Sequence, residues 1–105
     1  MVIANAAKCS VEQITTAFAA HFGIKPQDLR GRHNAKLVRR VRAVTVWFSW
    51  KCSTASIGAI SEYYGNRPVQ EIDSLLCDGK KLFLAGKFAT EIEGLCRKLK
   101  IRIYR

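Results

Sequence analysis

The side chains that could do chemistry in this chain are mainly those of arginine and lysine, and they are concentrated in two segments. Residues 30–51 include seven basic residues and no acidic one, and residues 97–105 include five more, again without an acid. Six of the eight acidic residues lie within 62–93. Because the signs are segregated and the formal charge is +10, we expect a polyanionic partner, nucleic acid first and an anionic membrane surface second.

The cysteines and acidic residues offer little for metal or covalent chemistry. The cysteines form no C-x-x-C pair, which argues against a zinc module and gives no reason to expect disulfides; they are Cys9, Cys52, Cys77 and Cys96. No cysteine lies beside a histidine in the sequence, and no pair of carboxylates is spaced for acid–base catalysis. We therefore expect neither an enzyme nor a bound cofactor or metal.

The length of 105 residues fits one domain, with a core at about 10–99 and a short basic tail at 100–105. No apolar run approaches the roughly 20 residues that a membrane span needs. The first ten residues lack the charged start and apolar stretch of a signal peptide. We expect a cytoplasmic protein without a membrane span.

The spacing of apolar residues predicts helices that position the first basic segment. Ser10 and Gln13 have the S-x-x-Q form of a capping box, and Gly23 is placed to end the helix that follows. Residues 24–29 predict a turn and a short helical turn. In 35–51 the 3–4 spacing favours a helix over a strand, although β-branched residues are frequent. Its expected buried stripe is Leu37, Val41, Val44 and Phe48, with Val38 and Thr45 beside it. Largely on other faces are Lys36, Arg39, Arg40 and Arg42.

Two short helices separated by a tight break are predicted next. The first has three candidate caps, Ser53, Thr54 and Ser56. It ends at Gly65, and Asn66 caps the second helix, with Pro68 in the first turn. The inner faces hold Ile57, Ile60, Tyr63 and Tyr64, and then Ile72, Leu75 and Leu76. This arrangement is typical of a helix-turn-helix, and whether Gly79 breaks its second helix is open.

A last amphipathic helix carries Phe88, Ile92, Leu95 and Leu99 and begins at Lys80, at Lys87 or as a continuation of the helix before it. The sequence therefore predicts an all-α fold, a compact bundle of five to six helices that contains a helix-turn-helix.

The order of these features resembles the C-terminal duplex-binding domain of the bacterial replication initiator DnaA. The family's V-x-x-I-x-x-x-V-A-x-x-[FY]-x-[VI] pattern is matched from Val11 to Ile24, and its D-L-x-[GS]-[KR] turn by residues 28–32. Its R-x-R is matched by Arg40 and Arg42. The two helices around F-G-G-R-D-H-[ST]-T-V correspond to residues 64–72, in a register that runs to residue 99. The resemblance implies a DnaA- or Trp-repressor-like fold, duplex DNA as the partner, and a bacterial nucleoid or phage-encoded protein.

The chain departs from this family where the family reads bases. The Asp-His-Thr/Ser-Thr run is replaced by Pro68, Val69, Gln70 and Glu71, and the minor-groove arginine by Asn34. The resemblance therefore implies a stand-alone protein of replication or transcription control whose base specificity differs from that of the initiator. It also implies phosphate contacts at Lys36, at Arg42 and at the helix start of Ile57.

The candidate DNA-contacting residues form two groups. Base reading is expected from Arg67, Val69, Gln70 and Glu71. Contacts to the backbone or the minor groove are expected from Arg30, Arg32, His33, Asn34, Lys36, Arg39, Arg40, Arg42 and Ile57. A glutamine side chain pairs with adenine through two hydrogen bonds, and a glutamate accepts from the amino group of cytosine. The alternative for Glu71 is a favourable interaction with the helix dipole, and Val69 either touches a thymine methyl group or packs.

Two other functions compete with duplex binding. A protein-interaction module, acting on replication or transcription proteins with only weak non-specific DNA binding, is suggested by Pro68, Glu71, Asp73 and Asp78. The other competing function is a membrane-surface role for the basic helix. The sequence shows no zipper heptads, so a monomer is favoured.

Overall fold

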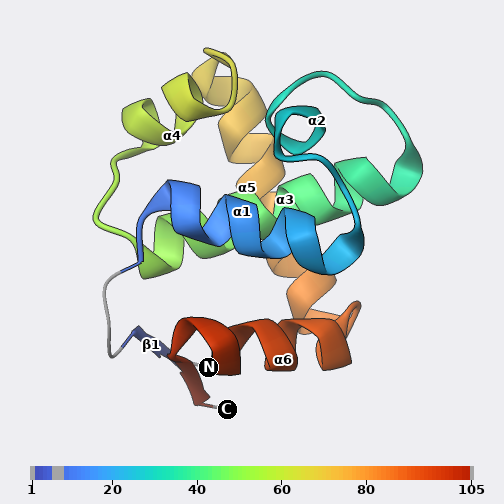
Figure 1. Cartoon of the computed structure of the whole chain (residues 1–105). Coiled ribbons are helices and arrows are strands. Elements are labelled where there is room, and N and C mark those ends of the chain that lie inside the picture. The colour runs from blue at the N-terminus through green and yellow to red at the C-terminus, as the bar shows by residue number, and fades with distance from the viewer. Residues whose placement is uncertain (1, 6–8, 105) are drawn as a thin grey trace.

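A computed structural model describes the backbone of residues 2–5 and 9–104 and the side chains of residues 9–101. The elements in chain order are β1 (Val2–Asn5), α1 (Val11–Phe22), α2 (Pro26–Arg30), α3 (Lys36–Cys52), α4 (Ile57–Tyr63), α5 (Val69–Leu84), α6 (Ala89–Leu99) and β2 (Ile101–Tyr104). Figure 1 shows the helices packed together with both ends of the chain on one side. The predicted all-α bundle is confirmed, with six helices in the described part of the chain.

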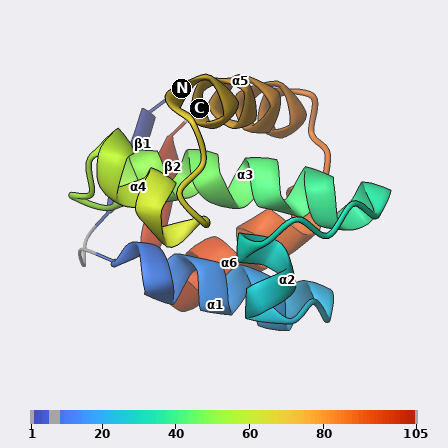
Figure 2. The same cartoon turned by 90° about the horizontal axis from the view of Figure 1, so that it is seen from above.

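Helix α3 is the central element of the fold. Figure 2 shows it between α5 and α1. Every residue from 41 to 49 is buried, so the middle of α3 is enclosed all round and not only along one stripe. Two polar residues in this stretch hydrogen-bond within the helix, Thr45 to the Val41 carbonyl and Ser49 to the Thr45 carbonyl.

The predicted stripe on α3 is partly wrong at its first turn. Leu37 is 45% exposed, whereas Val38 is buried. Val38, Val41, Thr45 and Phe48 are spaced by three, four and three residues, and the predicted stripe by four, three and four. Both spacings are helical, so the pattern alone does not choose between them. The side chain of Phe48 then packs against Phe18 of α1 and Phe83 of α5, with ring centroids 5.5 and 5.4 Å apart.

The two ends of α1 follow the sequence signals. The Ser10 hydroxyl accepts from the Gln13 amide and the Gln13 side chain accepts from the Ser10 amide, which completes the predicted capping box. Gly23 ends the helix with a φ of 66°, a conformation that glycine adopts without strain.

The connection between α4 and α5 differs from the prediction in its capping residue. Ser56 caps α4 as one of the three candidates, and Tyr64 is fully buried behind its last turn. Gly65 and Asn66 both have positive φ, 85° and 57°, and so make the turn itself. Asn66 therefore does not cap α5; Pro68 is the N-cap residue and Val69 begins the helix.

Gly79 does not break α5. Instead, it lets the backbone of α5 approach that of α3. The helix runs without interruption to Leu84, and Gly79 is buried. A methyl group at this position would overlap the carbonyl oxygen of Ala43 and would lie 2.9 Å from Cβ of Trp47. Any side chain here would push the two helices apart.

The last helix begins later than the predicted starts at Lys80 and Lys87, and it does not continue from α5. α5 includes Lys80, and a break follows at Gly86, where φ is 78°. Helix α6 then starts at Ala89, two residues after the predicted start at Lys87. Ile92 and Leu95 are buried in the core as expected.

The two strands form an antiparallel ribbon that the sequence did not reveal. Val2 pairs with Tyr104 and Asn5 with Ile101, so part of the expected tail is paired with the start of the chain. Cys9 and Ile101 are both buried in the core. Arg105 of the predicted tail lies outside the described residues. No helix in the described residues has the length and apolar character required to cross a membrane.

Substituting Gly79 by alanine tests the close contact between α3 and α5. We expect Gly79→Ala to lower the free energy of unfolding by about 1–3 kcal/mol, because the added methyl group meets backbone that cannot yield locally. The matched control is Gly94→Ala in α6, where a methyl group meets nothing within 4 Å. That change should raise stability by about 0.5–1 kcal/mol. Chemical denaturation measures both, and equal stability of the Gly79→Ala variant and the unchanged protein would contradict the packing.

Candidate functional site

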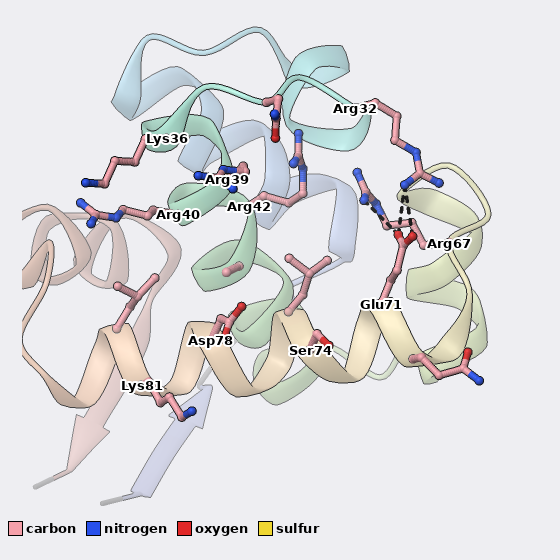
Figure 3. Close-up of a pocket in the computed structure, with 15 residues that line it drawn as sticks. Arg32, Lys36, Arg39, Arg40, Arg42, Arg67, Glu71, Ser74, Asp78 and Lys81 are labelled. Carbon is pink, nitrogen blue, oxygen red and sulfur yellow. Dashed lines mark hydrogen bonds and ion pairs between the residues drawn. The ribbon is translucent and has the colours of Figure 1, made fainter.

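A groove of about 850 Å³ lies between α5 and the first half of α3, with the α2–α3 loop at one end. Its floor includes Ala43, Leu75 and Leu82. Its polar lining is Arg32, Asn34, Lys36, Arg39, Arg40, Arg42, Arg67, Gln70, Glu71, Ser74, Asp78 and Lys81. Figure 3 shows the basic side chains of the loop and of α3 facing the side of α5 that carries Glu71, Ser74 and Asp78. Seven cations and two carboxylates thus share this one surface.

Most of the predicted DNA-contacting residues line this groove. The loop and α3 contribute Arg32, Asn34, Lys36, Arg39, Arg40 and Arg42, and the α5 side contributes Arg67, Gln70 and Glu71. These two groups are about thirty residues apart in the chain. The close contact at Gly79 brings them to the same surface.

Five of the groove's cations are exposed or half-buried. Arg32, Lys36, Arg39 and Lys81 are exposed, and Arg40 is half-buried. Ion pairs within the described residues engage only Arg32 among these five. The uncompensated positive charge along one wall makes the groove attractive to a polyanion.

Arg42 lies inside the fold, where it holds the loop in place. Its side chain is only 5% exposed. Nε donates to the Leu29 carbonyl at 2.7 Å, and Nη2 donates to the carbonyls of Asp28 and His33, each at 2.9 Å. Burial, and next the nearby charge of Arg67, lower the pKa of the Arg42 guanidinium. The prediction that Arg42 lies on a solvent face is therefore wrong, because three backbone carbonyls require its donors.

Arg67 is also used largely within the protein. It is 7% exposed, and its guanidinium donates to the carbonyls of Tyr64 and Gly31. It also donates to Glu71 across 3.3 Å, one helical turn further along. Arg67 thus ties the α2–α3 loop to the turn before α5 and to the start of that helix.

Glu71 is shared between two arginines. Its carboxylate accepts from Nη1 of Arg32 at 3.1 Å and from Nη1 of Arg67 at 3.3 Å. The dashed lines of Figure 3 mark these contacts, in which Arg32 approaches from the loop and Arg67 from the turn before α5. The carboxylate that the sequence offers for base reading therefore already has partners in the protein alone.

Four predicted residues do not line the groove. Arg30 donates to the Tyr63 carbonyl at 2.8 Å, and its guanidinium lies 3.9 Å from the centre of the Tyr63 ring. Nδ1 of His33 accepts from the Ala35 amide, and Ile57 is the first residue of α4. Val69 is 55% exposed at the start of α5. Their DNA contacts remain predictions.

Two polar residues of α5 that line the groove, Ser74 and Lys81, were missed in the sequence, and Asp78 was named there only for a protein partner. Together with Gln70 they recur at intervals of four, four and three residues, which places them on one face of a helix. This spacing was visible in the sequence, but a helix break at Gly79 would have separated Lys81 from the other three residues. With α5 continuous, this face runs along the whole groove.

The buried thiols do not form a reactive centre. Burial raises the pKa of Cys52 to about 12, with the thiols of Cys96 and Cys9 nearby, and raises that of Cys96 to about 11. A thiol with such a pKa stays protonated near neutrality and is a weak nucleophile. Among the described residues, no three His, Cys, Asp or Glu side chains are grouped so that they could hold a metal ion.

Comparison with protein-family models, with curated proteins and with solved structures found no match. The resemblance to the DnaA C-terminal domain therefore stands only on the sequence patterns described above.

Removing the Arg42 side chain should destabilise the protein. We expect Arg42→Met to lower the free energy of unfolding by about 2–4 kcal/mol, because the carbonyls of residues 28, 29 and 33 lose a charged donor. Arg39→Gln on the exposed side of the same helix should change stability by less than about 0.5 kcal/mol. Urea unfolding monitored by circular dichroism compares them. If both variants were equally stable, the loop would not depend on Arg42.

Proposed function

We propose that this protein binds double-stranded DNA with sequence preference, through α5 and the cations beside it. The observation that supports this most is the groove, where exposed cations from two distant segments meet along one helix face that carries polar side chains. In this proposal α4, the turn and α5 act as a helix-turn-helix, and α5 enters the major groove. The cations of the loop and of α3 then lie beside the helix, where one phosphate backbone runs.

The exposed first turns of α5 are the proposed base-reading surface. Val69 and Gln70 are both exposed there, and Ser74 follows one turn later on the same face. The Gln70 amide suits adenine, and a methyl group of Val69 suits thymine. Arg67 is held by backbone carbonyls, so we assign it to positioning the helix start. The protein acts in this proposal as a DNA-binding regulator of replication or transcription, without catalysis.

A protein partner is the second candidate function. The observation that favours it is the presence of two carboxylates, Glu71 and Asp78, in an otherwise basic groove. A carboxylate repels phosphate, whereas a protein segment with both signs of charge can pair with both kinds of side chain. This candidate predicts weak duplex binding without any preferred sequence.

The salt dependence of binding tests the phosphate contacts. The five outward cations of the groove, of which Arg32 is paired with Glu71, predict a slope of about −4 to −5 when log K is plotted against log salt concentration. Seven contacts would give a steeper slope, but Arg42 and Arg67 are turned into the fold. Fluorescence anisotropy with a labelled duplex gives this slope. A slope near zero would contradict electrostatic binding.

Neutralising a single cation tests whether the groove itself is used. Arg40→Gln should weaken binding to every duplex by about fivefold at 0.15 M salt and reduce the slope by about 0.9. Lys98→Gln is the matched control, because this exposed residue of α6 removes the same charge but does not line the groove. Equal losses in the two variants would show that only net charge matters.

Selection from a randomised duplex pool at roughly physiological salt tests sequence preference. We expect a compact enriched motif and expect Gln70→Ala to blur one or two of its positions, since the amide no longer pairs with a base. A selection without enrichment would favour the protein-interaction function. An unchanged motif for Gln70→Ala would mean that another face of the protein reads the bases.

A further inference from the structure

Arg32, Arg67 and Glu71 form a network at the end of the groove. Arg67 is held in place in it, whereas Arg32 is able to change partner. Arg67 is 7% exposed and donates to two backbone carbonyls as well as to Glu71. Arg32 is 66% exposed and, within the described residues, hydrogen-bonds only to Glu71. The ion pair between Arg32 and Glu71 joins two partly exposed side chains, and such a pair is weak and opens easily.

Glu71 cannot readily leave the network, because the buried arginine keeps it there. Its Oε2 accepts from both arginines, and Arg67, in the turn just before α5, contacts it across 3.3 Å. A phosphate that approaches the loop must therefore compete with a carboxylate that stays close to its target. Asp78, further along the groove, forms no ion pair in the described part of the chain.

We propose that Glu71 is a built-in competitor that holds Arg32 away from phosphates and so lowers the affinity for non-specific DNA. This inference rests on the proposed function, and it assigns Glu71 to specificity through Arg32. When a DNA phosphate takes over Arg32, the carboxylate of Glu71 is released from Arg32 but keeps its contact with Arg67 at the start of α5. There it is free to accept from a cytosine amino group, or it faces repulsion from the DNA when no such donor is present.

The first test compares Glu71→Gln with Asp78→Asn on a random-sequence duplex. Both variants remove one negative charge from the same groove, but only Glu71→Gln frees Arg32. We expect Glu71→Gln to tighten non-specific binding about two- to fivefold more than Asp78→Asn does. The slope of log K against log salt concentration should become steeper by up to about one. In the unchanged protein the carboxylate released from Arg32 takes up a cation from solution, and in the Glu71→Gln variant this uptake does not occur. Equal effects of the two variants would overturn the inference.

The second test repeats Glu71→Gln in an Arg32→Gln background. The gain in affinity should then fall to that of Asp78→Asn, since the freed cation is missing. A gain of the original size would overturn the inference, because Glu71 would then act through another group. Circular dichroism melting of each variant shows whether it folds.

A third measurement does not require any Glu71 variant to fold. In the otherwise unchanged protein, Arg32→Gln should weaken non-specific binding less than Arg40→Gln does, because Arg32 is occupied. Equal or larger losses for Arg32→Gln would overturn the inference. If the unchanged protein does not bind duplex DNA at low salt, the proposed function fails as well; if it binds and only these comparisons fail, the role of Glu71 alone is wrong.

Discussion

The close contact between α3 and α5 at Gly79 is the constraint on which the rest of the structure depends. Because residue 79 has no side chain, the backbone of α5 rests directly on Ala43, and the two helices share the aromatic core around Trp47, Phe48 and Phe83. This contact aligns one face of α5 with the basic first half of α3, and the groove opens between them. A larger residue would separate the two walls and would also disturb the core beneath them.

Buried arginines complete the groove by fixing the loop at its end. Arg42 binds the carbonyls of Asp28 and Leu29 in α2 and of His33 in the loop that follows, and Arg67 binds that loop and the turn before α5. A buried guanidinium requires hydrogen-bond acceptors such as these carbonyls. Its hydrogen bonds also hold backbone that lacks the regular hydrogen bonding of a helix or sheet. The chain thus divides its basic residues into two sets. The inward arginines set the shape of the loop, and the outward cations give the groove its charge.

Much of the helical fold could be predicted from the sequence, because caps, glycines and 3–4 spacing are local signals. The capping box at Ser10, the stop at Gly23 and the helix through Ile92 and Leu95 are of this kind. The ribbon of β1 and β2 could not be predicted, because it joins the two ends of the chain. The groove itself was not predicted, but many of its residues were visible as a basic segment. Which arginines turn inward depends on tertiary partners. In the sequence, Gly79 is compatible with either a helix break or a close contact between helices. Only the position of Ala43 in the fold decides between the two.

The central claim is that duplex DNA binds along α5 and the first half of α3. Two-dimensional amide NMR of the 11.8 kDa protein during titration with a short duplex tests this claim directly. We expect the largest shift changes in residues 32–40 and 69–81, with small changes in α1 and α6. Changes concentrated in α1 or α6, or no changes at a salt concentration where the groove's charge is unscreened, would contradict the account.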